Sequence, residues 1–144
     1  MDAKRIRVFC VDDSAATLRL NQLLIDAQSD MECVGIALTT AHLAEEVERT
    51  SPDVVLLDYL MPGCSPLETL KDLRARFPEL RLLVVSGYDE DSAVDQSLAH
   101  GATGYFVKSS EAGAFLNSIR RVARGERVLA TRREEFRRFP TARE

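Results

Sequence analysis

The sequence predicts an α/β fold with a doubly wound parallel sheet. Short runs rich in Val, Ile and Leu alternate with longer segments whose apolar residues recur at helical spacing. Such runs are typical of strands buried on both faces of a parallel sheet, and open α/β sheets bind ligands at the carboxyl ends of their strands. Four of the runs end on or just before reactive residues: Asp12 and Asp13, Asp58, Ser86, and Lys108. We therefore expect these side chains to gather on one rim of the sheet.

Turn and capping residues divide the first half of the chain into three strand and helix pairs. Ser14 is placed to cap a helix, and the sequence Ser51-Pro52-Asp53 ends the next one. Pro66 suits the first turn of a third helix, which Pro78 ends. We expect strands at residues 6–11, 32–38 and 54–58, and helices at residues 15–27, around residues 43–47, and at residues 66–77.

The second half adds two further pairs. Gly101 is placed as the C-cap of one helix, Ser110 as the N-cap of the last, and Gly125 at its end. We expect strands at residues 81–85 and 104–107, and helices at residues 92–100 and 110–125.

Five strand and helix units with right-handed crossovers and helices on both faces predict a flavodoxin-like, five-stranded sheet with five helices. The strand order expected for this arrangement is 2-1-3-4-5, which places the first and third strands side by side. Asp12, Asp13 and Asp58 would then meet at one rim. Residues 1–127 are predicted to form this domain, and residues 128–144 a tail or truncated linker.

Composition narrows the class of protein. The chain has 144 residues, is 45% hydrophobic and carries a net charge of -4, which favours one domain that does not bind nucleic acid. Its three cysteines are an odd number without C-x-x-C spacing, as in reduced proteins of the cytoplasm. No apolar stretch approaches the roughly 20 residues that span a bilayer. We therefore expect a cytoplasmic location and no membrane contact.

Three carboxylates on one rim repel one another unless a cation offsets their charge. Oxygen ligands suit Mg²⁺, and no set of Cys and His residues points to zinc. An aspartate can also attack phosphorus and form an aspartyl-phosphate. The Lys108 ammonium and the Ser86 hydroxyl are suited to share the charge of a transferring phosphoryl group.

At these residues the chain resembles the receiver domains of bacterial two-component response regulators, over about residues 5–125. The resemblance implies that Asp12 and Asp13 bind Mg²⁺ and that Asp58, followed by Met61-Pro62, is the phosphoacceptor. It also implies a further metal ligand, the Leu60 backbone carbonyl. Ser86, Tyr105 and Lys108 correspond to the family's switch hydroxyl, switch aromatic and phosphate-contacting lysine.

The same resemblance implies a function and partners. Asp58 would take a phosphoryl group from a sensor histidine kinase or a phosphotransfer protein, which makes the domain a signalling switch rather than an enzyme. The surface formed by the fourth helix, the fifth strand and the fifth helix would change its contacts, homodimerisation included.

Residues 101–108 and 123–126 are most similar to the subgroup of receivers that precede a LuxR-type helix-turn-helix output domain. The residues that follow Gly125 are too few to form such an output domain. The expected output is therefore transcriptional control through a domain missing from this chain, and the alternative is a stand-alone receiver that acts by protein contact. Ser109 follows Lys108 where many family members have proline, often after a cis peptide bond.

Two other functions use the same residues. A magnesium-dependent phosphohydrolase of the haloacid dehalogenase type also forms an aspartyl-phosphate, but it requires Asp-x-Asp after the first strand, whereas Asp12 and Asp13 are adjacent. An interaction module that works without phosphorylation would keep the fold and have no need of the intact set of reactive residues.

Overall fold

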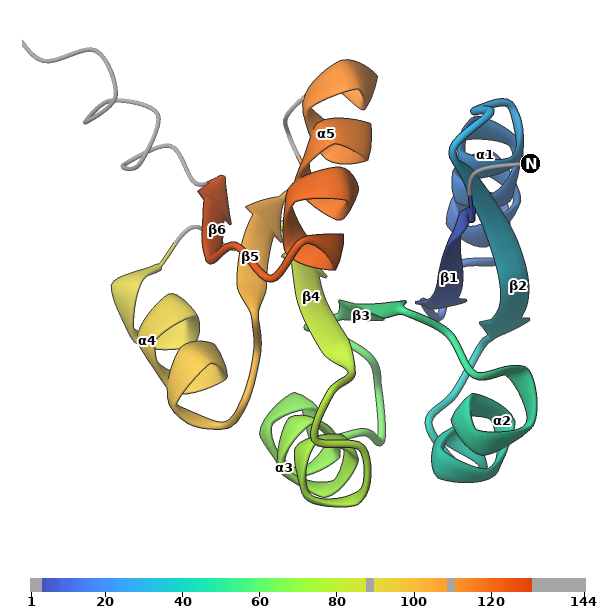
Figure 1. Cartoon of the computed structure of the whole chain (residues 1–144). Coiled ribbons are helices and arrows are strands. Elements are labelled where there is room, and N and C mark those ends of the chain that lie inside the picture. Colours follow the sequence, from blue (N-terminus) through green and yellow to red (C-terminus); the bar gives the residue numbers. More distant parts are fainter. Residues whose placement is uncertain (1–3, 88–89, 109–110, 131–144) are drawn as a thin grey trace, which may run out of the picture.

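The computed structural model describes residues 4–87, 90–108 and 111–130 and contains a six-stranded parallel sheet in the order β2-β1-β3-β4-β5-β6 (Figure 1). The strands are β1 (Ile6–Val11), β2 (Met31–Ala37), β3 (Val54–Asp58), β4 (Arg81–Ser86), β5 (Gly104–Val107) and β6 (Val128–Ala130). The helices are α1 (Ala15–Asp26), α2 (Leu43–Thr50), α3 (Pro66–Arg76), α4 (Asp91–Ala99) and α5 (Ala112–Ala123).

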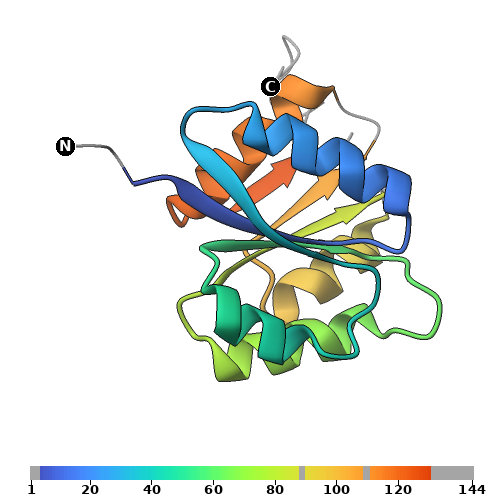
Figure 2. The ribbon, with the colours of Figure 1, turned by 90° about the vertical axis from the view of Figure 1, so that its right-hand side faces the viewer.

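Helices cover both faces of the sheet. Figure 2 shows α1 and α5 on one face and α2, α3 and α4 on the other. Each face has its own core because successive residues of a strand point to opposite sides. Phe9, Leu57 and Tyr105 belong to the core beneath α2, α3 and α4, whereas Cys10, Leu56 and Phe106 belong to the core beneath α1 and α5.

Ser14 and Pro66 act at the starts of their helices as the sequence predicts. The Ser14 side chain accepts a hydrogen bond from the Thr17 N–H at 3.2 Å, and α1 begins at the next residue. Ser65 accepts one from the Glu68 N–H at 3.3 Å, with Pro66 at the start of α3. For α5 the N-cap is Glu111, while the expected cap, Ser110, lies outside the described residues.

The predicted parallel sheet and the order of its first five strands are confirmed, but the predicted number of strands is wrong. β6 pairs in parallel with β5, so the first three residues of the predicted tail form a sixth strand. After α5, Gly125 has φ of +87° and its N–H donates to the Val122 carbonyl oxygen at 2.8 Å. This turn brings the apolar residues from Val128 onward to the edge of β5, where backbone groups need hydrogen-bond partners. The rest of the expected tail lies outside the described residues.

Backbone hydrogen bonds align the strand ends at the rim. The Asp12 N–H donates to the Ala37 carbonyl oxygen at 3.1 Å, and the Lys108 N–H donates to the Ser86 carbonyl oxygen at 2.7 Å. Each bond holds a residue at or just beyond the end of its strand, so the reactive side chains start from a fixed backbone.

In the part of the chain that the structure describes, every helix is too short or too polar to cross a membrane.

Candidate functional site

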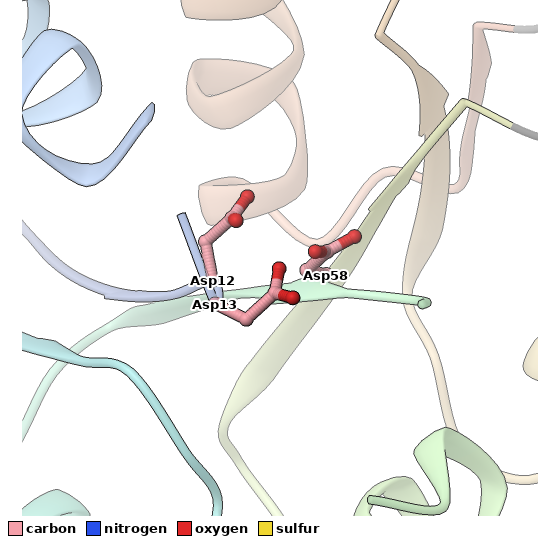
Figure 3. A group of neighbouring side chains, drawn as sticks. All are labelled: Asp12, Asp13 and Asp58. Carbon is pink, nitrogen blue, oxygen red and sulfur yellow. The ribbon is translucent and has the colours of Figure 1, made fainter. Parts of the chain in front are cut away.

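Three carboxylates meet at the carboxyl ends of β1 and β3. Asp12 and Asp13 follow β1, Asp58 ends β3, and Figure 3 shows their side chains converging. One oxygen from each carboxylate lies within 4.8 Å of the others. Asp12 and Asp58 are buried and Asp13 is exposed, so the group is open to solvent on one side. The predicted meeting of these three residues is confirmed, and it follows from the pairing of β1 with β3.

Lys108 lies between the two buried carboxylates. Its Nζ is 3.1 Å from Asp12 Oδ2 and 3.4 Å from Asp58 Oδ1. Among the described residues it is the one basic side chain in ion-pair contact with any of the three carboxylates. One positive charge therefore faces three negative charges, and this imbalance favours a further cation at the site.

Backbone amides fix the orientation of the same two carboxylates. Asp12 Oδ1 accepts a hydrogen bond from the Ser14 N–H at 2.9 Å, and Asp58 Oδ1 accepts one from the Leu60 N–H at 3.3 Å. Asp12 therefore uses one oxygen for the start of α1 and the other for Lys108. The Leu60 side chain is exposed, and the expected role of its carbonyl as a metal ligand stays a prediction.

Burial and charge shift two pKa values in this group. Burial raises the pKa of Asp58, because it disfavours the charged form; the Lys108 ammonium lowers it, but not enough to compensate. Burial alone would lower the pKa of Lys108, but its hydrogen bond to Asp12 and the charge of Asp58 outweigh burial and raise that pKa. Without a metal, the Asp58 carboxylate is thus held in a partly unfavourable environment.

This environment predicts that Asp58→Asn stabilises the metal-free protein at neutral pH. Because the folded pKa of Asp58 is raised, the folded state binds a proton more tightly than the unfolded chain does, and stability falls as pH rises from about 4 through the folded pKa. Asparagine removes the buried charge. At pH values above the folded pKa of Asp58, the thermal midpoint of Asp58→Asn should therefore be higher than that of the wild type. Below about pH 4 the two midpoints should approach each other. Thermal unfolding in EDTA at a series of pH values measures this difference. A lower midpoint for Asp58→Asn at every pH would show that the contact with Lys108 outweighs burial.

Ser86 and Tyr105 lie on β4 and β5, the two strands that follow β3 in the sheet. Ser86 ends β4 and is fully buried, and Asp58 pairs with Val85 in the strand register. Tyr105 is 0% exposed, and its ring centroid lies 6.2 Å from that of Tyr59, the residue after Asp58. The expected switch aromatic is thus already inside the core in this structure. The geometry of the Lys108–Ser109 bond lies outside the described residues.

The donor chemistry of this group fits a small, hard cation. Carboxylate oxygens are the ligands preferred by Mg²⁺, which keeps several waters and is often completed by phosphate oxygens. The exposed position of Asp13 leaves room for such waters and for an incoming phosphoryl group. Three carboxylates that could hold a cation and one ammonium group are therefore arranged around one point of the rim.

A family model for the response regulator receiver domain matches residues 8–120, which include all of these side chains. The chain belongs to this family. Receiver domains are signalling domains of two-component systems, and the strand order and carboxylate group described above agree with membership.

Several relatives are transcriptional regulators by name. The receiver domain is 31% identical over 131 residues to the uncharacterized transcriptional regulatory protein YxjL of Bacillus subtilis, covering 91% of this chain and 60% of that protein. It is 32% identical over 127 residues to the DNA-binding transcriptional activator DevR/DosR of Mycobacterium tuberculosis, covering 88% of this chain and 58% of the relative. The chain thus spans less than two thirds of these relatives.

Solved receiver structures have the same fold. The signal receiver domain of the putative response regulator NarL from Mycobacterium tuberculosis superposes with a TM-score of 0.78 at 29% identity, covering 86% of this chain and all of that one. The response regulator domain of Thermotoga maritima CheB gives a TM-score of 0.75 at 31% identity, covering 84% of this chain and 98% of the other.

One feature near the site escaped the sequence analysis. Leu129 of β6 pairs with Tyr105 and packs against the same core. The apolar run Val128-Leu129-Ala130 was visible in the sequence, but three residues are too few for their spacing to separate a strand from a tail.

Proposed function

We propose that this receiver domain is a phosphoacceptor that takes a phosphoryl group at Asp58 from a phosphohistidine, carried by a sensor histidine kinase or a phosphotransfer protein. The observation that supports this proposal best is the position of Asp58: it is a buried carboxylate in contact with a lysine ammonium, and one of its oxygens lies within 4.8 Å of an oxygen from each of two further carboxylates. This arrangement supplies a nucleophile, a positive charge and a metal-binding set together.

In the proposed reaction, one Asp58 oxygen forms a bond to phosphorus while the bond from phosphorus to the histidine nitrogen breaks. The backbone amide of Leu60 orients the Asp58 carboxylate. Lys108, already 3.4 Å from Asp58, would contact a phosphoryl oxygen as a point charge. Asp12 and Asp13, together with Asp58 and the Leu60 carbonyl, would hold Mg²⁺, which when bound neutralises charge on the transferring oxygens.

The proposed switch uses Ser86 and Tyr105. The hydroxyl of Ser86 would approach the phosphoryl group, and the inward position of Tyr105 would belong to the phosphorylated state. Both residues border the surface of α4, β5 and α5, which is the proposed output surface for homodimerisation or for a target. Because β6 covers the edge of β5, this surface includes β6 in the present structure. We also propose control of transcription as the output, because several relatives are named as transcriptional regulators.

Rapid labelling by a small phosphodonor tests this function. With Mg²⁺ and acetyl phosphate, intact-mass analysis should show one phosphoryl adduct per chain, and EDTA should abolish it. Sustained turnover of p-nitrophenyl phosphate without a stable adduct would instead identify a phosphohydrolase. The absence of both reactions would leave an interaction module that works without phosphorylation, and would overturn the proposal.

A further inference from the structure

The edge strand β6 is in direct register with the switch aromatic. Tyr105 pairs with Leu129, between the pairs Gly104 with Val128 and Phe106 with Ala130. Partners in a parallel ladder place their side chains on the same face of the sheet. Leu129 packs against the core that contains Tyr105, so the two side chains lie side by side on the face of the sheet that α2, α3 and α4 cover.

β6 packs tightly against the sheet. The Val128 side chain is 1% exposed and belongs to the core beneath α5. A Cβ atom on Gly104 would lie 2.8 Å from the Val128 carbonyl oxygen, a distance that real side chains do not tolerate. The glycine at the start of β5 therefore allows the two backbones to approach, and β6 is a built part of the sheet.

This position restricts where the Tyr105 ring can go. Toward the centre of the sheet lies β4, and on its own face the ring is covered by the core beneath α2, α3 and α4. Toward the sheet edge beyond β5 lies β6, with Leu129 at the position paired with Tyr105. Among the described residues, Leu129 of the docked β6 therefore lies in the path of a movement of the Tyr105 ring toward this edge.

We propose that β6 is a latch that holds Tyr105 in its inward position, so that docking of residues 128–130 and phosphorylation of Asp58 favour the same state. The link to phosphorylation rests on the proposed function, whereas the link between β6 and Tyr105 does not. Since coupling between two sites is reciprocal, phosphorylation should tighten the docking of β6, and docking of β6 should tighten the binding of a phosphoryl analogue by the same factor.

The first test asks whether β6 controls Tyr105 without any phosphoryl analogue. Leu129→Asp places a charge in the contact with Tyr105, and Leu38→Asp makes the same change at an exposed leucine just after β2, at the opposite edge of the sheet. The full chain is labelled with fluorotyrosine, the Tyr105 signal is assigned with Tyr105→Phe, and hydrogen exchange follows residues 128–130. Leu129→Asp should lower protection of β6 and move the Tyr105 fluorine signal toward its solvent-exposed position, and Leu38→Asp should do neither.

Two outcomes of this test overturn the latch. One is an unchanged Tyr105 signal in Leu129→Asp although β6 has lost its protection. The other is unchanged protection of β6, which would show that the strand does not depend on the contact with Tyr105. If circular dichroism shows that Leu129→Asp is unfolded, Leu129→Ala is used in its place, and Leu38→Ala becomes the control. The same two outcomes then overturn the proposal.

The second test measures the coupling with beryllofluoride, a phosphoryl analogue, in the presence of Mg²⁺. The analogue should raise protection of β6 in the wild type, and Leu129→Asp should weaken its apparent affinity by about fivefold or more. Equal affinity in both proteins would overturn the coupling. If beryllofluoride changes no signal from Asp12, Asp13 or Asp58 in any variant, the proposed function fails, and the first test still decides whether β6 holds Tyr105.

Discussion

Asp58→Asn should abolish labelling by acetyl phosphate. The amide that replaces the carboxylate has nearly the same shape, but it lacks the negatively charged oxygen that attacks phosphorus. The adduct should therefore fall to background, a loss of more than about a hundredfold in rate. Intact-mass analysis after treatment with acetyl phosphate and Mg²⁺ measures this loss directly.

Asp53→Asn is the matched control, because Asp53 directly precedes the first residue of β3, whereas Asp58 is its last residue. Its carboxylate accepts a hydrogen bond from the Arg7 N–H at 2.9 Å, and an asparagine oxygen can accept the same bond. This variant should label like the wild type. The same adduct on Asp58→Asn as on the wild type would contradict the assignment of Asp58, and a mapped adduct on Asp12 or Asp13 would identify the nucleophile in its place.

Asp13→Ala should weaken Mg²⁺ binding at least about tenfold, or about 1.4 kcal/mol. The variant removes one of three carboxylates whose oxygens lie within 4.8 Å of one another. Because the Asp13 side chain is exposed, the alanine should change the free energy of unfolding by no more than about 0.5 kcal/mol. Calorimetry, or NMR shifts of residues around the three carboxylates during a Mg²⁺ titration, reports the affinity.

The control for this measurement is Asp95→Ala, an equal change of charge at an exposed position on α4. Screening by salt makes a distant surface charge a weak influence on the metal, so its affinity should match the wild type. Equal affinities in Asp13→Ala and wild type would show that Asp13 is no metal ligand. Equal losses in the two variants would show that net charge, rather than coordination, determines binding.

Most of the fold could be predicted from the sequence, because local signals and topology rules agree. Apolar runs marked β3 and β5 with the bounds that the structure shows, and Ser14 and Pro66 marked the starts of α1 and α3. The order of the first five strands followed from right-handed crossovers and from helices on both faces. Once β1 and β3 were neighbours, Asp12, Asp13 and Asp58 had to share a rim.

Contacts between distant segments could not be predicted in the same way. The sequence placed Lys108 on the rim, but its position between Asp12 and Asp58 depends on side-chain packing across the four strands from β1 to β5. The raised pKa of Asp58 likewise depends on burial, which no short segment determines.

The sequence alone thus determined the family, the parallel sheet and which side chains gather at its rim, because each depends on local patterns and on their order along the chain. The tertiary structure alone decided that Val128–Ala130 becomes β6, that Leu129 lies beside Tyr105, and that the ring is already inside the core. Three apolar residues after a glycine turn form a strand only where a neighbouring edge offers hydrogen bonds and an apolar face to cover, and β5 supplies both.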